Sequence, residues 1–286
     1  MPLGVWLKWS NLLGLLLGAS AMASGCGATR DTVRSQNRID LAKDLLNRAD
    51  TTQAEVEIKR ALAYDDRNEE AHNLYGLIEV VKGQQAMAIV ETSDCIDGGD
   101  AASIRAEADA HIQAAGIHFA RATEIAPDYG EAWQNRGVVA MHFHDWDKAT
   151  EYFLKALEHQ ERLDNAILAR ANLGWAYFQK QDYVRATAEL LQANQGPRYF
   201  CLGKYRLASV YFARKDYDHA AEALRPILGD VKMCPPLPEA QYLGGQTFLR
   251  LREREAAQKA FSSCVQMAPK SCQARDCKKA LAELTP

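Results

Sequence analysis

The sequence repeats a pattern with a period near 34 residues, and this periodicity limits the possible fold more than any other feature. Four segments, beginning at residues 130, 167, 201 and 238, carry small and large apolar side chains at corresponding positions. The second and third segments begin 34 residues apart, and the neighbouring spacings are slightly longer. A fixed period of this length is typical of a solenoid, in which each unit buries its apolar face against the next one.

The repeated residues indicate a pair of helices in each segment. Small residues at fixed positions let two helices approach closely, and large residues fill the gap between neighbouring units. Helix-forming residues dominate the chain, and strand-like alternation is hard to find. The matching positions are Trp133, Gly137, Ala149, Phe153 and Ala156; Leu173, Gly174, Tyr177, Ala186, Leu190 and Ala193; Leu207, Ala208, Tyr211, Ala220 and Leu224; and Gly245, Phe248, Ala257, Phe261 and Pro269.

This pattern resembles the tetratricopeptide repeat, a helix–turn–helix unit with small and aromatic residues at the same places. The resemblance implies an all-α fold, built as a right-handed superhelical solenoid. Two weaker copies lie upstream. The first carries Leu41, Ala42, Leu45, Ala54, Ile58 and Ala61.

The second upstream copy is interrupted. Gly76 occupies the small-residue position of its first helix, but the partner helix follows only near 106–124. An insertion over about 84–105 separates them, and it contains Cys95 and several turn-forming residues. We expect this insertion to form a loop or a helical extension on one face of the solenoid.

These observations predict six repeats followed by a capping helix. The repeats are expected at 35–68, 69–127, 130–163, 167–200, 201–234 and 238–271. In the cap, at 272–286, Cys277, Leu281 and Leu284 are expected to face inward. A solenoid needs such a cap, because its last repeat would otherwise leave an apolar face in water.

The first 25 residues have the features of a bacterial signal peptide. The apolar run Leu12–Ala19 follows a single basic side chain, and it is too short to span a bilayer. Ala23-Ser24-Gly25-Cys26 then resembles a lipobox, in which Cys26 is lipidated and residues 26–34 form a tether. Ala23 differs from the usual Leu, and ordinary cleavage after Ala23 is the alternative. Gly27 stands where Asp would indicate inner-membrane retention, so resemblance to other lipoproteins favours the periplasmic face of the outer membrane.

Export from the cytoplasm favours disulfide bonds among the other six cysteines. Cys201 opens the fifth repeat and Cys234 follows it, so both lie at one edge of the stack and are predicted to pair. Cys264 faces the cap and is expected to pair with either Cys277 or Cys272. Cys95 either joins this set or stays free. Zinc binding is a weaker interpretation, because the chain has no CxxC pair.

The repeat resemblance also implies a concave face, lined by fixed positions of each first helix. In repeats four to six these positions hold many aromatic and aliphatic residues: Leu168, Trp175, Phe178, Leu202, Tyr205, Phe212, Tyr242 and Leu249. An apolar groove that stays open would bind an amphipathic helix or an extended peptide. The alternative is that these residues pack against each other or against the insertion.

The same positions are polar in the first half of the chain, which is consistent with solvated surface. They hold Gln36, Lys43, Asn47, Glu70, Asn73, Glu131 and Gln134.

No catalytic, metal or nucleic-acid site is evident in the sequence. The formal net charge is −3, and the chain lacks the runs of Lys and Arg that are typical of nucleic-acid binding. His142 and His144 lie two residues apart, and residues with this spacing on a helix point to different faces. The segment coincides with an inter-helix turn, so Asp145 and Asp147 are expected as turn residues rather than as metal ligands. His111 and His118 share one helix face and are interpreted as a surface pair. We therefore expect a non-enzymatic chain with no cofactor and no metal.

An exported, lipidated array of six such repeats resembles the pilotins of type IV pilus machines, the PilF/PilW group. The interrupted second repeat and the Cys-rich C-terminal half most resemble the myxobacterial branch. The resemblance implies a monomer that binds secretin (PilQ) subunits and helps them assemble into the outer-membrane ring. A general envelope-assembly scaffold is the alternative among binding proteins. A periplasmic hydrolase on a repeat-built body is the alternative among enzymes.

Overall fold

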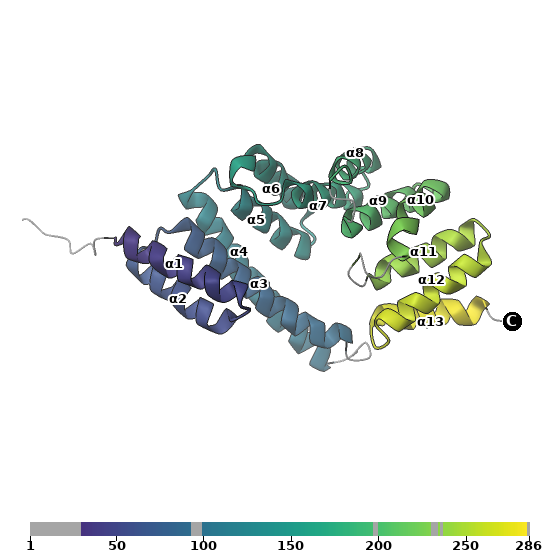
Figure 1. Cartoon of the computed structure of the whole chain (residues 1–286), viewed down its shortest axis with the longest axis horizontal. Helices are drawn as coiled ribbons and strands as arrows, with labels where there is room; N and C mark the ends of the chain where they lie inside the picture. The colour runs from purple at the N-terminus through teal and green to yellow at the C-terminus, as the bar shows by residue number, and fades with distance from the viewer. Residues whose placement is uncertain (1–29, 93–98, 197–199, 230–233, 235–236, 285–286) are drawn as a thin grey trace, which may run out of the picture. The chain divides into compact units, whose positions relative to one another are not determined.

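The computed structural model describes residues 30–92, 99–196, 200–229, 234 and 237–284, and the side chains of 91–100 lie outside that description. The described residues form thirteen α-helices and one short 3-10 helix, with no β-strand among them (Figure 1). The predicted all-α fold is confirmed. Within this part of the chain, no helix combines the length and the apolarity needed to cross a membrane. Cys26, the predicted lipidation residue, and Cys95 of the insertion both fall outside the described residues.

The helices follow one another as packed pairs, and each pair packs on the next one. The first helices are α1 (Thr32–Asn47), α3 (Glu69–Thr92), α5 (Gly130–His142), α7 (Ala166–Gln179), α9 (Cys201–Ala213) and α11 (Pro238–Arg250). Their partners are α2 (Thr51–Tyr64), α4 (Gly99–Ile125), α6 (Trp146–Glu158), α8 (Tyr183–Ala193), α10 (Tyr217–Leu228) and α12 (Arg254–Met267). The 3-10 helix η1 (Gln160–Arg162) precedes α7, and α13 (Cys272–Leu284) packs on α12 and α11.

A recurring turn ends the first helix and starts the second. His144, for example, has a left-handed backbone with φ of 57°, and the next N–H, that of Asp145, donates to the Ala140 carbonyl oxygen over 2.9 Å. The Asp145 side chain then accepts from the backbone N–H of Lys148 and caps α6. Non-glycine residues with positive φ end five of the first helices: Ala49, His144, Gln181, Lys215 and Arg252.

The core is built from close contacts between small and aromatic residues. Phe153 of α6 is fully buried, and a Cβ atom added at Gly137 of α5 would lie 2.5 Å from its ring. Gly76 faces Phe119 at the same distance in the second pair, and Gly245 faces Phe261 in the sixth. The small residue of the repeat pattern is therefore required by the ring opposite it.

The interruption of the second repeat is helical on both sides of its undescribed centre. α3 has 24 residues and α4 has 27, whereas the other α-helices have 11 to 16. The added turns pack against each other, since Ala86, Val90 and Ala101 are buried. Of the two expected forms of the insertion, the helical extension accounts for residues 84–92 and 99–105.

Two disulfides link described cysteines. Cys201 and Cys234 are joined with a Cα–Cα distance of 5.8 Å, which is the pairing that the sequence favoured. Cys264 is joined to Cys277, with a Cα–Cα distance of 6.3 Å, so the cap is fastened to α12. Cys272, at the start of α13, is also disulfide-bonded. Inside the cap Cys277 is fully buried, while the side chains of Lys278, Lys279 and Glu283 are exposed.

Candidate functional site

The eight apolar groove positions lie on the first helices of three successive pairs, α7, α9 and α11. Seven of them are partly buried: Leu168, Trp175, Phe178, Leu202, Tyr205, Phe212 and Tyr242. Leu249 is 38% exposed. The stripe is therefore neither a packed core nor an open surface, and its members differ in what they contact.

Three of these residues form one cluster, which we call the aromatic surface: Trp175, Phe178 and Tyr205. The ring centroids of Trp175 and Phe178 lie 4.9 Å apart on α7, and Tyr205 of α9 lies 6.3 Å from Trp175. Burial raises the pKa of the Tyr205 hydroxyl. Mutual contact holds the three rings in place while part of each stays accessible, which suits anchors for a partner's apolar side chains.

The remaining groove positions do not join this cluster. Phe212 packs on Tyr217 of α10, with centroids 5.4 Å apart, and Tyr242 packs on the buried ring of Phe261. Tyr242 is therefore mainly a core residue. Phe212 and Leu249 together line a separate cavity of about 450 Å³, with Gln246 and Arg250 completing its wall.

A buried arginine beside the aromatic surface was missed by the sequence analysis. Arg206 of α9 is only 9% exposed, and its guanidinium carbon lies 5.6 Å from the centre of the Trp175 ring. Its Nη1 donates to Oδ1 of Asn172, and no carboxylate pairs with it among the described residues. Burial lowers the pKa of Arg206 to about 10. Periodicity could not reveal it, because the repeat pattern of small and large apolar residues does not include charged residues.

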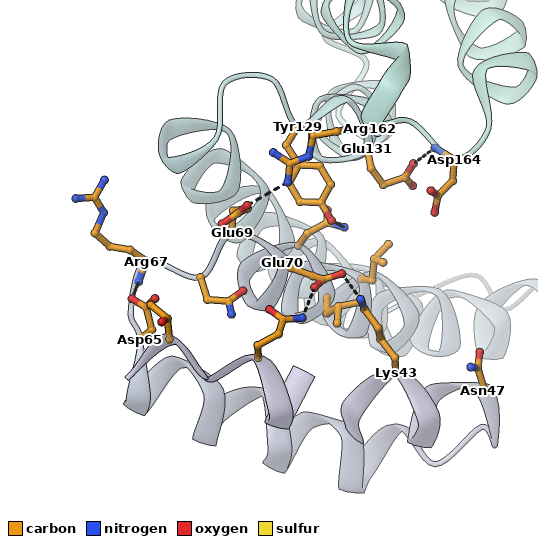
Figure 2. Close-up of a pocket in the computed structure, with 16 residues that line it drawn as sticks. Lys43, Asn47, Asp65, Arg67, Glu69, Glu70, Tyr129, Glu131, Arg162 and Asp164 are labelled. Carbon is orange, nitrogen blue, oxygen red and sulfur yellow. Dashed lines mark hydrogen bonds and ion pairs between the residues drawn. The ribbon is translucent and has the colours of Figure 1, made fainter. Parts of the chain in front are cut away.

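A larger cavity, of about 740 Å³, lies at the other end of the repeats; we call it the polar pocket (Figure 2). It includes six of the seven polar positions of the first half: Gln36, Lys43, Asn47, Glu70, Asn73 and Glu131. Gln36 and Asn47 are exposed, as expected of solvated surface, whereas Asn73 and the seventh position, Gln134, are buried, so the expectation is wrong for these two. The lining residues are Thr32, Gln36, Lys43, Asn47, Asp65, Arg67, Asn68, Glu69, Glu70, Asn73, Leu74, Leu77, Tyr129, Glu131, Arg162 and Asp164.

Two ion pairs cross the polar pocket between different helix pairs. Lys43 of α1 binds Glu70 of α3, which also accepts a hydrogen bond from Gln36 Nε2 over 3.0 Å (Figure 2). Arg162 of η1 lies 3.1 Å from a carboxylate oxygen of Glu69. The charged side chains therefore connect repeats one, two and three.

Asn73 forms the buried floor of this region. It is 2% exposed, donates from Nδ2 to the Tyr129 hydroxyl oxygen over 3.3 Å, and accepts from Nδ2 of Asn135 over 2.9 Å. Burial raises the pKa of Tyr129, and the Arg162 guanidinium stacks 4.4 Å from the centre of that ring. These contacts fix the wall from which Glu131 projects.

The histidines named in the sequence analysis have separate partners. His142 Nε2 lies 2.7 Å from Asp109, while His144 occupies the left-handed turn and Asp145 caps α6. His111 and His118 do not contact each other: His111 pairs with Glu79 over 2.6 Å, and His118 Nδ1 lies 3.2 Å from Nδ1 of His72. The part of the chain that the structure describes contains no group of three or more side chains able to hold a metal ion.

The comparisons with known proteins show the fold. No family model matches the sequence, and no curated protein is significantly similar to it. The crystal structure of PilW, a widely conserved type IV pilus biogenesis factor, is similar with a TM-score of 0.64 and 19% identity, covering 85% of this chain and 97% of PilW. Pseudomonas aeruginosa PilF is similar with a TM-score of 0.65 and 14% identity, covering 86% of this chain and 97% of PilF.

The same fold also occurs in a different setting. A chain of the APC/C hetero-tetramer Cut9–Hcn1 is similar with a TM-score of 0.56 and 17% identity, covering 86% of this chain and 48% of that one. The predicted helical solenoid of tetratricopeptide repeats is confirmed by these likenesses together with the paired helices.

Proposed function

We propose that this protein acts in type IV pilus biogenesis as a pilotin, binding secretin subunits and promoting their assembly into a ring in the outer membrane. Its likeness to PilW and PilF, which extends over 97% of each of those chains, carries the proposal. The interrupted second repeat and the C-terminal disulfides favour a role like that of the myxobacterial pilotin Tgl. The function is one of binding.

In this proposal the aromatic surface captures an apolar segment of the secretin subunit. Trp175 and Tyr205 are half-buried, so their rings are already ordered and little entropy is lost when a partner docks. Burying a few hundred Å² of apolar surface at about 25 cal/mol per Å² gives ample gross stabilisation. The captured segment would be kept from aggregating until it pairs with neighbouring subunits in the ring.

Lipidation of Cys26 would place the protein at the inner leaflet of the outer membrane. Confinement to that surface raises the effective concentration of the protein where secretin subunits must assemble. The protein would act as a monomer, with the membrane lipid and secretin as its partners. Substituting Cys26 by Ala and separating the membranes tests this part: continued palmitate labelling and outer-membrane sedimentation would contradict it.

The experiment counts secretin multimers in cells that carry the double variant Trp175→Ala with Phe212→Ala. This variant alters both the aromatic surface, through Trp175, and the separate cavity that Phe212 lines with Leu249. Phe143 and Leu154 offer a matched control, because they are 44% and 48% exposed and lie outside the groove positions. The groove variant is expected to stay folded and membrane-bound but to lose secretin multimers, while the control keeps them. Normal multimers in a folded groove variant would contradict the pilotin role and leave a general envelope scaffold as the better proposal. A large fall in the melting temperature would show that these rings serve the core.

A further inference from the structure

The polar pocket holds more negative than positive charge. Five carboxylates line it, from Asp65, Glu69, Glu70, Glu131 and Asp164, against the three cations Lys43, Arg67 and Arg162. Two of the cations are already occupied, since Lys43 binds Glu70 and Arg162 binds Glu69. The third, Arg67, extends away from the other labelled side chains (Figure 2).

Three of these carboxylates have no ion-pair partner among the described residues: Asp65, Glu131 and Asp164. Asp65 accepts a hydrogen bond from the backbone N–H of Arg67 over 3.0 Å, whereas Glu131 and Asp164 lie together. Glu131 Oε2 accepts a hydrogen bond from the backbone N–H of Asp164 over 3.2 Å, and neither side chain has an ion-pair partner among the described residues. Glu131 is partly buried, and that burial raises the pKa of its carboxyl group. A carboxylate that has lost part of its water and gained no cation is stabilised when a ligand supplies one.

The backbone places these two groups side by side. Gly130 starts α5 against η1 so closely that a Cβ atom there would overlap the His159 carbonyl oxygen and lie 3.1 Å from that of Arg162. Only glycine permits this approach, which brings Glu131 within reach of the Asp164 N–H. The carboxylate pair is thus held by the backbone of the third repeat, independently of the aromatic surface.

We propose that the polar pocket binds an extended polypeptide segment that carries a lysine or arginine, whose side chain lies against Glu131 and Asp164. Charge complementarity selects the cation, and the cavity of about 740 Å³ is large enough for several residues of an extended chain. Polar side chains on the wall, Asn47 among them, can bind the peptide backbone. This site would give the protein a second, polar contact with a partner that the aromatic surface holds by apolar side chains.

The test measures binding of a blocked eight-residue peptide of alternating lysine and serine to the full chain by calorimetry at low salt. The matched peptide has glutamate in place of lysine, and free spermidine serves as a small cationic competitor. We expect the lysine peptide to bind, the glutamate peptide not to bind, and affinity to fall with added salt. Glu131→Gln should weaken binding about tenfold, because it removes the charge and keeps the acceptor for the Asp164 N–H.

Glu151→Gln is the matched control, since it makes the same change of net charge on α6 and Glu151 does not line the pocket. Its binding should equal that of the unaltered protein. Failure of the lysine peptide to bind, or equal weakening by Glu131→Gln and Glu151→Gln, would overturn the proposal. Spermidine that binds as tightly as the peptide would also overturn it, because the site would then recognise free amines. The double variant Trp175→Ala with Phe212→Ala should still bind the peptide, which separates this site from the proposed pilus role.

Discussion

Arg206 donates from Nη1 to Oδ1 of Asn172 over 2.7 Å, and this bond joins the first helices of two successive repeats. The two residues are 34 positions apart, so they occupy corresponding depths in neighbouring repeats. Both are buried, and the guanidinium has no carboxylate partner among the described residues. A neutral amide oxygen is therefore the principal polar contact of a buried positive charge that lies beside Trp175.

This relationship predicts unequal effects on the free energy of unfolding for two apolar substitutions. Asn172→Leu removes the acceptor and leaves the guanidinium buried without it, so the free energy of unfolding should fall by about 3 kcal/mol. Arg206→Met removes the charge itself, and its cost should be much smaller or even reversed. Urea denaturation of both variants gives the comparison.

The double variant Asn172→Leu with Arg206→Met provides the control for this prediction. It should recover most of the stability lost in Asn172→Leu, because no unpaired polar group remains in the interior. Additive losses in the double variant would show that the hydrogen bond is not the interaction that matters.

Gly137→Ala should destabilise the third repeat. The added Cβ would lie 2.5 Å from the Phe153 ring, and overpacking of this kind costs about 1–3 kcal/mol. Pairing it with Phe153→Leu should return part of that loss, because the smaller side chain leaves room. Gly229→Ala is the matched control: its Cβ would meet only the Arg225 carbonyl oxygen at 3.7 Å, so thermal unfolding should be unchanged. Equal melting temperatures for the two alanine variants would contradict this account.

Contacts such as Gly137 with Phe153 could be predicted from the sequence, because the repeat pattern fixes which small residue faces which large one. The same pattern gave the helix pairs and placed Cys201 near Cys234. Each of these features depends on spacing within one repeat or between adjacent repeats, and spacing is what a sequence displays directly.

The polar pocket and Arg206 could not be predicted in this way. Glu131 owes its position to the approach of α5 to η1, and Asn172 meets Arg206 only because two helices pack at a particular separation. Polar residues at groove positions look alike in a sequence whether they are solvated or enclosed. Separating the two cases requires the distances between helices, which the pattern does not contain.

Acidification should weaken the packing of α3 on α4 through a histidine pair. Nδ1 of His72 lies 3.2 Å from Nδ1 of His118, and burial lowers the pKa of both rings. The charge of His72 lowers the pKa of His118 further. The unfolded chain therefore binds more protons than the folded one near pH 6.5, so stability is present above that value and is lost as the pH falls through it. Arg121 also lowers the pKa of His72, whereas Asp66 and Glu124 raise it and reduce the effect.

The measurement compares urea denaturation at pH 7.5 and 5.5 for the unaltered protein and for His118→Phe, which keeps a ring against Tyr75. The unaltered protein should lose more stability than the variant, by less than about 1 kcal/mol because both rings are partly solvated. His219, whose pKa is raised by its hydrogen bond to Asp216, acts in the opposite direction but is common to both proteins. The same loss in both proteins would exclude the pair as the cause.

Removing the disulfide between Cys264 and Cys277 should loosen the cap without unfolding the repeats. The bond closes a loop with a sequence separation of 13, for which the loss is about 3 kcal/mol, and alanine is the suitable replacement because both side chains are fully buried. Contacts in a solenoid are made between neighbours, so the effect should stay local to α13. Cys272 is also disulfide-bonded and still holds the start of that helix, so faster amide hydrogen exchange is expected mainly toward Leu284. The control is Cys201→Ala with Cys234→Ala, which should leave hydrogen exchange in α13 unchanged. If the amides of α13 exchange equally slowly in both double variants, packing on α12 and α11 is sufficient to hold the cap.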